Sequence, residues 1–167
     1  MMKRTTLTII ALLLAVAAAA QPKPDPKEAR RIQLVLISWF ECEECNSGEL
    51  RNVVALGRQV VPMLAAAVQR GPAPASRELY RQQLLGAYAD LSAYARSHQE
   101  EKIQLSSQDE YLSIYLGNYT ATYKVRAAKA LAAIGGDDAT VALKRGLEQA
   151  DRDDVKEAIT NALRKQK

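Results

Sequence analysis

The sequence predicts an all-α fold in which short amphipathic helices stack around a longer helical hairpin, in the manner of an α-solenoid. Apolar residues recur with the period of a helix, and Gly, Pro or Asp residues separate the periodic segments. No segment alternates apolar and polar residues with the period of a half-buried strand. The helical pattern is clearest in the last segment, where one face carries Val155, Ala158, Ile159, Ala162 and Leu163.

The first twenty residues have the composition of a cleavable signal peptide, which predicts an exported protein, either periplasmic or secreted. Lys3 and Arg4 form a basic start, fourteen uncharged residues follow from Leu7 to Ala20, and small side chains precede Gln21. A helix of that length spans about 21 Å, whereas the hydrocarbon core of a bilayer is roughly 30 Å thick. We therefore expect no stable membrane anchor after cleavage.

Removal of residues 1–20 leaves 147 residues, which is enough for one domain with a sizeable core. Without Lys3 and Arg4 the formal net charge falls from +4 to about +2. The remaining charges of both signs are interspersed, whereas binding to nucleic acid requires clustered cations that displace counterions from phosphates. We expect no nucleic-acid partner.

The helical domain is expected to span residues 27–167, after a proline-rich linker at 21–26 that cannot continue a helix. A nearly continuous apolar run extends from Ile32 to Phe40. A buried strand would also explain this run, but a lone strand has no partner, so a helix is favoured. Four later helices are expected over the ranges Asn46 to Gly57, Val61 to Gly71, Ser76 to His98 and Tyr111 to Ile134. A further helix is expected to begin at Asp137-Asp138, and the last helix is expected to begin around Asp151 and Asp154.

Capping residues and glycines predict where several of these helices begin, end or break. Asn46 with Glu49, and Ser107 with Glu110, have the spacing of a capping box. The segment 111–134 is predicted to be interrupted near Gly117-Asn118. Two pairs of residues are then expected to separate it from the next helix: Gly135 and Gly136 end the first helix, and Asp137 and Asp138 cap the second.

The C-terminal third of the chain contains a weak internal repeat with an offset of 32 residues. A helix pair this short cannot bury its own apolar stripe, so neighbouring pairs must stack. The four aligned pairs are Tyr123 with Val155, Ala127 with Ile159, Ala130 with Ala162, and Leu131 with Leu163.

This sequence resembles the HEAT-like repeats of bacteria. The stretch VRAAKALAAIGG at 125–136 is close to the usual sequence of the first helix of these repeats. The stretch ALG at 55–57, followed by VVPML at 60–64, looks like a further copy. The resemblance is good over 123–165, fair over 49–70 and poor over 72–122. Small exported HEAT-repeat proteins of unassigned activity are similar to this chain.

The resemblance implies protein–protein interaction through helix faces, and it implies structural roles for five residues of the best-matching repeat. Arg126 is expected to bond a carbonyl or an acid of a neighbouring repeat, whereas Arg145, Arg152 and Lys156 are expected to be solvated. The residues with repeat-structural roles are Arg126, Ala127, Leu131, Gly135 and Gly136.

Cys42 and Cys45 form the only motif with reactive chemistry, and three interpretations of this pair remain open. In an oxidising compartment, an even number of closely spaced cysteines favours a structural disulfide. Redox exchange would need a lowered thiolate pKa, which three neighbouring glutamates oppose. A metal site would need more ligands, and His98, the only histidine, is far away in the sequence.

Four tyrosines, Tyr111, Tyr115, Tyr119 and Tyr123, recur every fourth residue and form one stripe on the predicted helix. Tyrosine combines a rigid apolar ring with a polar tip and is common in binding hot spots, so these four are candidates for a binding face. The alternative, which is favoured, is that the rings fill a wide core. Three tyrosines of the preceding helix are expected to face the stripe: Tyr80, Tyr88 and Tyr94.

The sequence contains no nucleophile–base arrangement, phosphate-binding glycine loop or metal-ligand cluster. We therefore expect a non-enzymatic protein without a cofactor or a bound metal. The leading hypothesis is an exported helical-repeat module that binds an unidentified protein partner, through the tyrosine stripe or the concave side of the stack. The alternative is a thiol–disulfide or metal-handling protein that uses Cys42 and Cys45.

Overall fold

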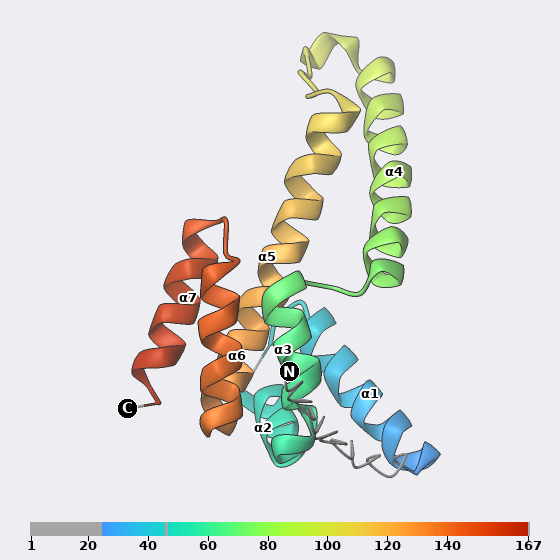
Figure 1. Cartoon of the computed structure of the whole chain (residues 1–167). Coiled ribbons are helices and arrows are strands. Elements are labelled where there is room, and N and C mark those ends of the chain that lie inside the picture. Colours follow the sequence, from blue (N-terminus) through green and yellow to red (C-terminus); the bar gives the residue numbers. More distant parts are fainter. Residues whose placement is uncertain (1–24, 46, 167) are drawn as a thin grey trace, which may run out of the picture.

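The computed structural model describes residues 25–45 and 47–166, and the regular structure of these residues is entirely helical, without a strand (Figure 1). The all-α prediction is therefore confirmed for this part of the chain. The predicted signal peptide, most of the linker and Asn46 lie outside the described residues. The helices are α1 (Pro26–Glu41), α2 (Ser47–Ala55), η1 (Gly57–Val60), α3 (Val61–Arg70), α4 (Pro74–Ser97), η2 (Gln99–Glu101), α5 (Gln108–Ile134), α6 (Asp137–Glu148) and α7 (Asp153–Arg164).

Local capping explains where α1 begins. The carboxylate of Asp25 accepts a hydrogen bond from the backbone N–H of Lys27 at 3.2 Å, and Pro26 occupies the first helical position, where its missing N–H costs nothing. The helix thus begins one residue before the predicted start of the domain. The apolar run from Ile32 to Phe40 is helical, as expected, because it packs on other helices instead of pairing with a strand.

Helix α5 is continuous through Gly117-Asn118, so the predicted break there is wrong. A glycine inside a helix costs only about 1 kcal/mol, and buried residues on both sides, Leu112 and Ala121, hold the helix together. The beginning of α5 agrees with the sequence, because the hydroxyl of Ser107 accepts a hydrogen bond from the backbone N–H of Glu110 at 3.2 Å.

The N-cap of α6 differs from the prediction. Gly136 occupies this position, so Asp137 and Asp138 lie in the first turn of α6, where their negative charge interacts favourably with the helix dipole without capping the helix. Helix α7 begins at Asp153, with Arg152 as its N-cap, in the segment where the last helix was expected to begin. Helix α5 ends at Gly135, as expected.

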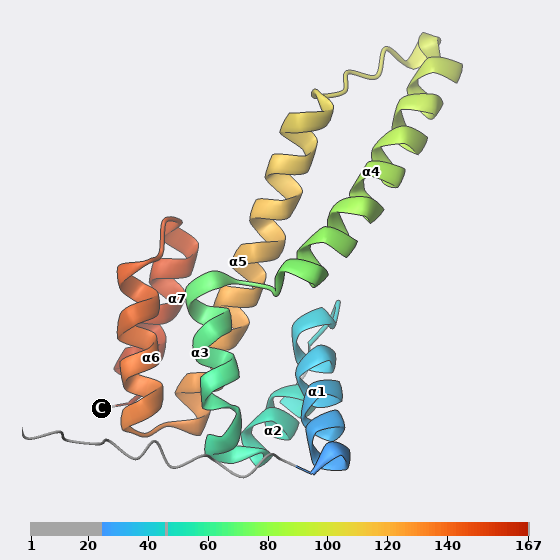
Figure 2. The same cartoon turned by 45° about the vertical axis from the view of Figure 1, so that its right-hand side comes forward.

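The C-terminal half of α5 lies at the centre of a helical body. Helices α3, α6 and α7 pack around it, and α1 and α2 pack along one side. The N-terminal half of α5 leaves this body and pairs with α4, so that the two helices form a projecting hairpin (Figures 1 and 2). The fully buried side chains of largest volume all belong to the body: Leu64, Leu131, Leu143, Ile159, Val53, Val60, Val68 and Val155.

A tight turn at Gly71 redirects the chain from α3 into the hairpin. Gly71 has a φ of 79°, which favours glycine, and a Cβ at this position would lie 2.6 Å from Cγ2 of Thr120 on α5. The close approach holds the start of α4 against the middle of α5. This turn is the feature that brings α4 next to α1 and α3.

Candidate functional site

An open groove of about 1130 Å³ lies where α1, α3 and the start of α4 meet. The middle of α5 closes its base with Leu116 and Tyr123. Most of the lining is apolar. The apolar part comprises Ala29, Ile32, Leu36, Ile37 and Phe40 of α1, Met63, Ala66 and Ala67 of α3, and residues 71–74 at the turn from α3 into α4. The polar residues of the lining are Gln33, Arg70, Ser76, Arg77, Glu78 and Arg81.

Helix α1 forms the outer wall of this groove, and its second half, from Ile32 to Phe40, is apolar on most sides. Its buried face packs on the body through Trp39 and Phe40, among others. Other apolar side chains of this half remain exposed: Ile37, which lines the groove, is 48% exposed, and Leu34, which lies outside the groove lining, is 58% exposed. Across the groove, Met63 of α3 is 46% exposed. The described residues therefore leave apolar surface on both walls in contact with water.

Arg126 of α5 fixes the C-terminal end of α1. Its guanidinium donates hydrogen bonds to the backbone carbonyls of Phe40, at 2.5 Å, and Cys42, at 2.7 Å. In return, the indole N–H of Trp39 donates to the backbone carbonyl of Arg126 at 3.2 Å. Carbonyls at a helix end have no partner within the helix, so these contacts hold the groove wall at a defined distance from α5.

Cys42 and Cys45 lie at this same helix end, at disulfide distance, with their Cα atoms 5.3 Å apart. Both side chains are half-buried beside the core. The pair lies in the connection between α1 and α2. No group of three or more His, Cys, Asp or Glu side chains that could hold a metal ion is found among residues 25–45 and 47–166.

The tyrosine stripe lies between α5 and the neighbouring helices. The ring of Tyr123 stacks on that of Phe40 of α1, with the ring centroids 4.5 Å apart, and the ring of Tyr119 stacks on that of Tyr80 of α4, with the centroids 4.2 Å apart. Further along the hairpin, the ring of Tyr111 packs against that of Tyr88, and these centroids are 5.3 Å apart.

Exposure differs among the four tyrosines of the stripe. Tyr111 and Tyr119 are half-buried and Tyr115 is 43% exposed, whereas Tyr123 is only 8% exposed and forms part of the groove base. Tyr94, which was expected to face the stripe, stacks on His98 near the hairpin tip instead. The stripe is therefore not one continuous accessible face.

The hydroxyls of Tyr119 and Tyr123 meet at Glu41, the last residue of α1. Tyr119 donates to Oε1 of Glu41 at 2.7 Å, and Tyr123 donates to the same oxygen. Burial and the hydrogen bond to this carboxylate raise the pKa of Tyr123 to about 12, and burial is also the main cause of the raised pKa of Tyr119. The sequence pattern gave no sign of this role for Glu41, which is 78 residues from its nearer partner.

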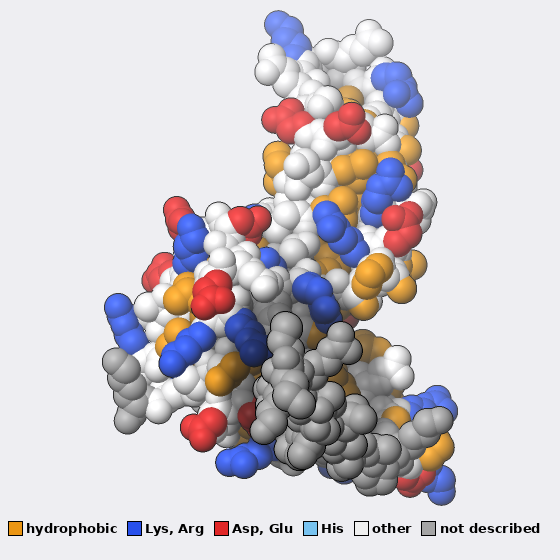
Figure 3. Space-filling model, viewed as in Figure 1, with side chains coloured by type: hydrophobic (Ala, Val, Ile, Leu, Met, Phe, Trp, Pro, Cys, Tyr) orange, Lys and Arg blue, Asp and Glu red, His pale blue; other side chains and the backbone are white. Residues whose placement is uncertain are grey.

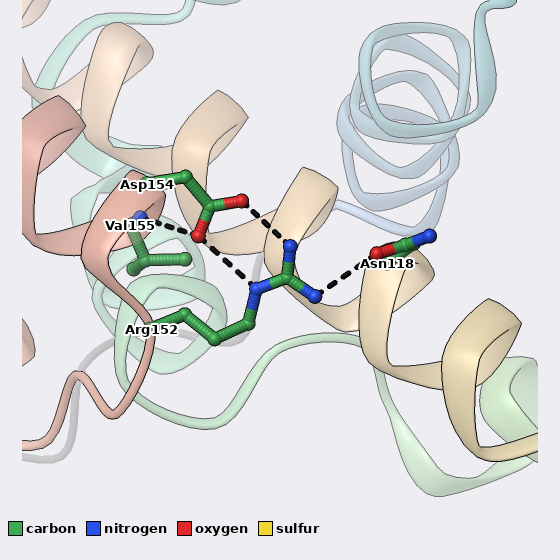
Figure 4. Close-up of polar contacts among 4 residues, drawn as sticks. All are labelled: Asn118, Arg152, Asp154 and Val155. Carbon is green, nitrogen blue, oxygen red and sulfur yellow. Dashed lines mark hydrogen bonds and ion pairs between the residues drawn. The ribbon is translucent and has the colours of Figure 1, made fainter.

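A smaller cleft of about 330 Å³ lies between α5 and the start of α7. Arg152, which was expected to be solvated, bridges the two helices there: it donates to Asn118 at 2.9 Å and to both carboxylate oxygens of Asp154 (Figure 4). The hydrogen bond from Arg152 lowers the pKa of Asp154. One of these oxygens also accepts the backbone N–H of Val155, so the contacts organise the beginning of α7.

No helix among the described residues is both long and apolar enough to cross a bilayer. No protein-family model, curated protein or solved structure matches this chain. Of the candidate residues from the sequence, the structure brings Tyr123 to the groove and Arg126 to its outer wall. It adds α1, Met63 and three arginines, which the sequence did not single out as a site.

Proposed function

We propose that this chain is an exported, non-enzymatic binding module of the HEAT-like type, which holds an apolar helix of another protein in the groove between α1, α3 and α4. The observation that carries this proposal is the uncovered apolar surface on both walls of the groove, at Ile37 and Met63. Large exposed apolar surface on a soluble protein marks an interaction site.

The position of the groove at one end of the helical stack supports the proposal. In stacked-helix proteins each layer is covered by the next, and a terminal helix needs a polar outer side to remain soluble. Helix α1 is the outermost layer of the body in Figure 2, and its groove-lining residue Ile37 is 48% exposed. A large apolar side chain of this kind is normally buried. A partner helix in the groove would cover Ile37.

The dimensions of the groove suit a short helix. Its lining along α1 runs from Ala29 to Phe40, and eleven residue steps of a helix extend about 16 Å. A partner helix of three turns would match this length and present apolar residues at the i, i+3, i+4 and i+7 positions, which is how amphipathic helices bind grooves.

The tyrosine stripe then serves mainly as support. Tyr119 and Tyr123 tie α5 to the end of α1 through Glu41, so they keep the groove open at a fixed width. Only Tyr123 contributes to the groove itself. The sequence suggested a binding role for all four tyrosines of the stripe, and this role is now proposed for Tyr123 alone.

Site-specific photo-crosslinking in the cells that produce the protein tests this function. A photoreactive residue at Met63 should capture an apolar segment of another protein, and Ile37→Asp in the same chain should remove that product. Ile37 is half exposed, so its replacement leaves the buried core of α1 intact.

Val141 provides the matched control, because it is 47% exposed on α6 and does not line the groove. A photoreactive residue there should give no such product. The proposal fails if both positions capture the same proteins, or if the Met63 product persists in Ile37→Asp.

A further inference from the structure

The rim of the groove carries three arginines, and they lie where α3 ends and α4 begins. Arg70 is the last residue of α3, and Arg77 and Arg81 follow in the first turns of α4, four residues apart and therefore on one face. All three side chains are exposed. In Figure 3, basic side chains lie next to hydrophobic ones at the lower end of α4.

The acidic side chains of the groove do not balance this charge. Glu78 is the only acid among the described residues of the lining. Its Oε1 pairs with Arg81 at 3.6 Å and accepts a hydrogen bond from Gln82 at 2.6 Å, so this carboxylate is already engaged within α4 through one of its oxygens. Arg70 and Arg77 have no ion pair and no side-chain hydrogen bond among the described residues. Two guanidinium groups thus remain unpaired beside an apolar channel.

We propose that the segment bound in the groove is an amphipathic helix whose apolar stripe is flanked by carboxylates, which pair with Arg70 and Arg77. This inference rests on the proposed function and specifies the chemistry of the partner. A guanidinium presents its donors in a planar fork that matches a carboxylate, and such pairs are stronger than neutral hydrogen bonds. Complementary charge at the rim of an interface selects the partner and speeds association.

The arrangement also assigns separate roles to the two parts of the site. Apolar contacts with Ile37, Met63 and the groove base supply most of the binding, because they remove uncovered apolar surface from water. The arginines discriminate between partners, since a helix with basic flanks would place like charges together. Discrimination should therefore weaken with added salt, because these guanidinium groups are exposed.

Two synthetic peptides test the inference. Both have about 18 residues, enough for an isolated helix to form in part, and both carry the same leucine stripe. One has glutamates along the flanks and the other has lysines. Fluorescence anisotropy with the mature protein at low salt should show at least about tenfold tighter binding of the glutamate peptide.

The double variant Arg70→Gln/Arg77→Gln should reduce this preference to less than about twofold while the leucine stripe still binds. Arg145→Gln is the matched control, because Arg145 is exposed on α6 and lies outside the groove. It should leave the preference unchanged.

The outcomes separate the inference from the proposed function. Equal binding of both peptides, weakened in each case by Ile37→Asp, would overturn the acidic partner and leave the groove as the site. Binding of neither peptide, or binding that ignores Ile37→Asp, would overturn both. A concentration-dependent dimer that Ile37→Asp abolishes would identify a second copy of the chain as the occupant and would also overturn the inference.

Discussion

At the scale of single residues, the end of α1 is held by polar contacts that cross long distances in the sequence. Arg126 binds the carbonyls of Phe40 and Cys42, and Tyr119 and Tyr123 donate to Glu41. These contacts surround the outer wall of the groove. Their loss would therefore affect the position of α1 before it affected the rest of the body.

The raised pKa of Tyr123 predicts a loss of stability at alkaline pH. The folded protein retains the phenol proton up to about pH 12, whereas the unfolded chain loses it near pH 10.0. This contribution is complete below pH 10 and disappears as pH rises toward 12. The proton of Tyr123 alone should lower the free energy of unfolding by about 1.4 kcal/mol per pH unit in this window, as measured by urea unfolding at increasing pH.

Tyr123→Phe should reduce this alkaline slope, because it keeps the ring stacked on Phe40 and removes the titrating hydroxyl. Tyr115→Phe serves as the control on the same stripe, since its hydroxyl has no hydrogen bond to an acid among the described residues. A slope unaffected by Tyr123→Phe would show that other groups cause the alkaline transition.

At the scale of helices, α3 and α6 approach each other closely at Gly146. A Cβ at this position would lie 2.9 Å from Cγ2 of Val68, so any larger residue would force Val68 or one of the helices to shift. Such contacts set the spacing of stacked helices, because a larger residue would separate them. The sequence pattern marks Gly146 merely as a weak helix former inside α6.

Gly146→Ala should lower the free energy of unfolding by about 1–3 kcal/mol, because the added methyl overpacks the α3–α6 contact. The matched control is Gly86→Ala in α4, where a Cβ would meet no atom within 4 Å. That change should stabilise the protein by about 0.5–1 kcal/mol. Chemical denaturation of the two variants measures the sign of the change in the free energy of unfolding for each. A destabilised Gly86→Ala variant together with a neutral Gly146→Ala variant would contradict this packing.

At the scale of the whole molecule, the body and the projecting hairpin differ in how much they bury. Leu84 is the only buried residue of α4, and Leu112 is the only one in the first half of α5. The C-terminal half of α5, by contrast, buries Tyr123, Ala127 and Leu131, among others. One continuous helix thus belongs to two regions that differ in burial.

Hydrogen exchange should resolve this difference along α5. Amides in the distal hairpin, over residues 85–115, should exchange at least about 100-fold faster than those of residues 121–134, because local opening there exposes little apolar surface. Mass spectrometry of peptic fragments measures both regions in one experiment. Uniform protection along the whole of α5 would show that the hairpin and the body unfold as one unit.

The features that the sequence predicted correctly depend on neighbouring residues. Ser107 caps α5 and Gly135 ends it, because capping and helix termination involve groups within one or two turns. The predicted break at Gly117-Asn118 fails for the complementary reason. A local helix breaker does not end α5 here, because packing on both sides of it holds the helix together, and this packing involves residues far away in the sequence.

What the sequence alone determined is the helical class, most helix boundaries and the closeness of Cys42 to Cys45, which are only three residues apart. Only the tertiary structure decided that α1, α3 and α4 enclose a groove, that Arg70 and Arg77 lie on its rim, and that Glu41 is a shared acceptor. The physical reason is separation along the chain. Helix periodicity and capping act over a few residues, whereas the groove depends on contacts such as that of Trp39 with Arg126, 87 residues apart, and these form only when whole helices pack.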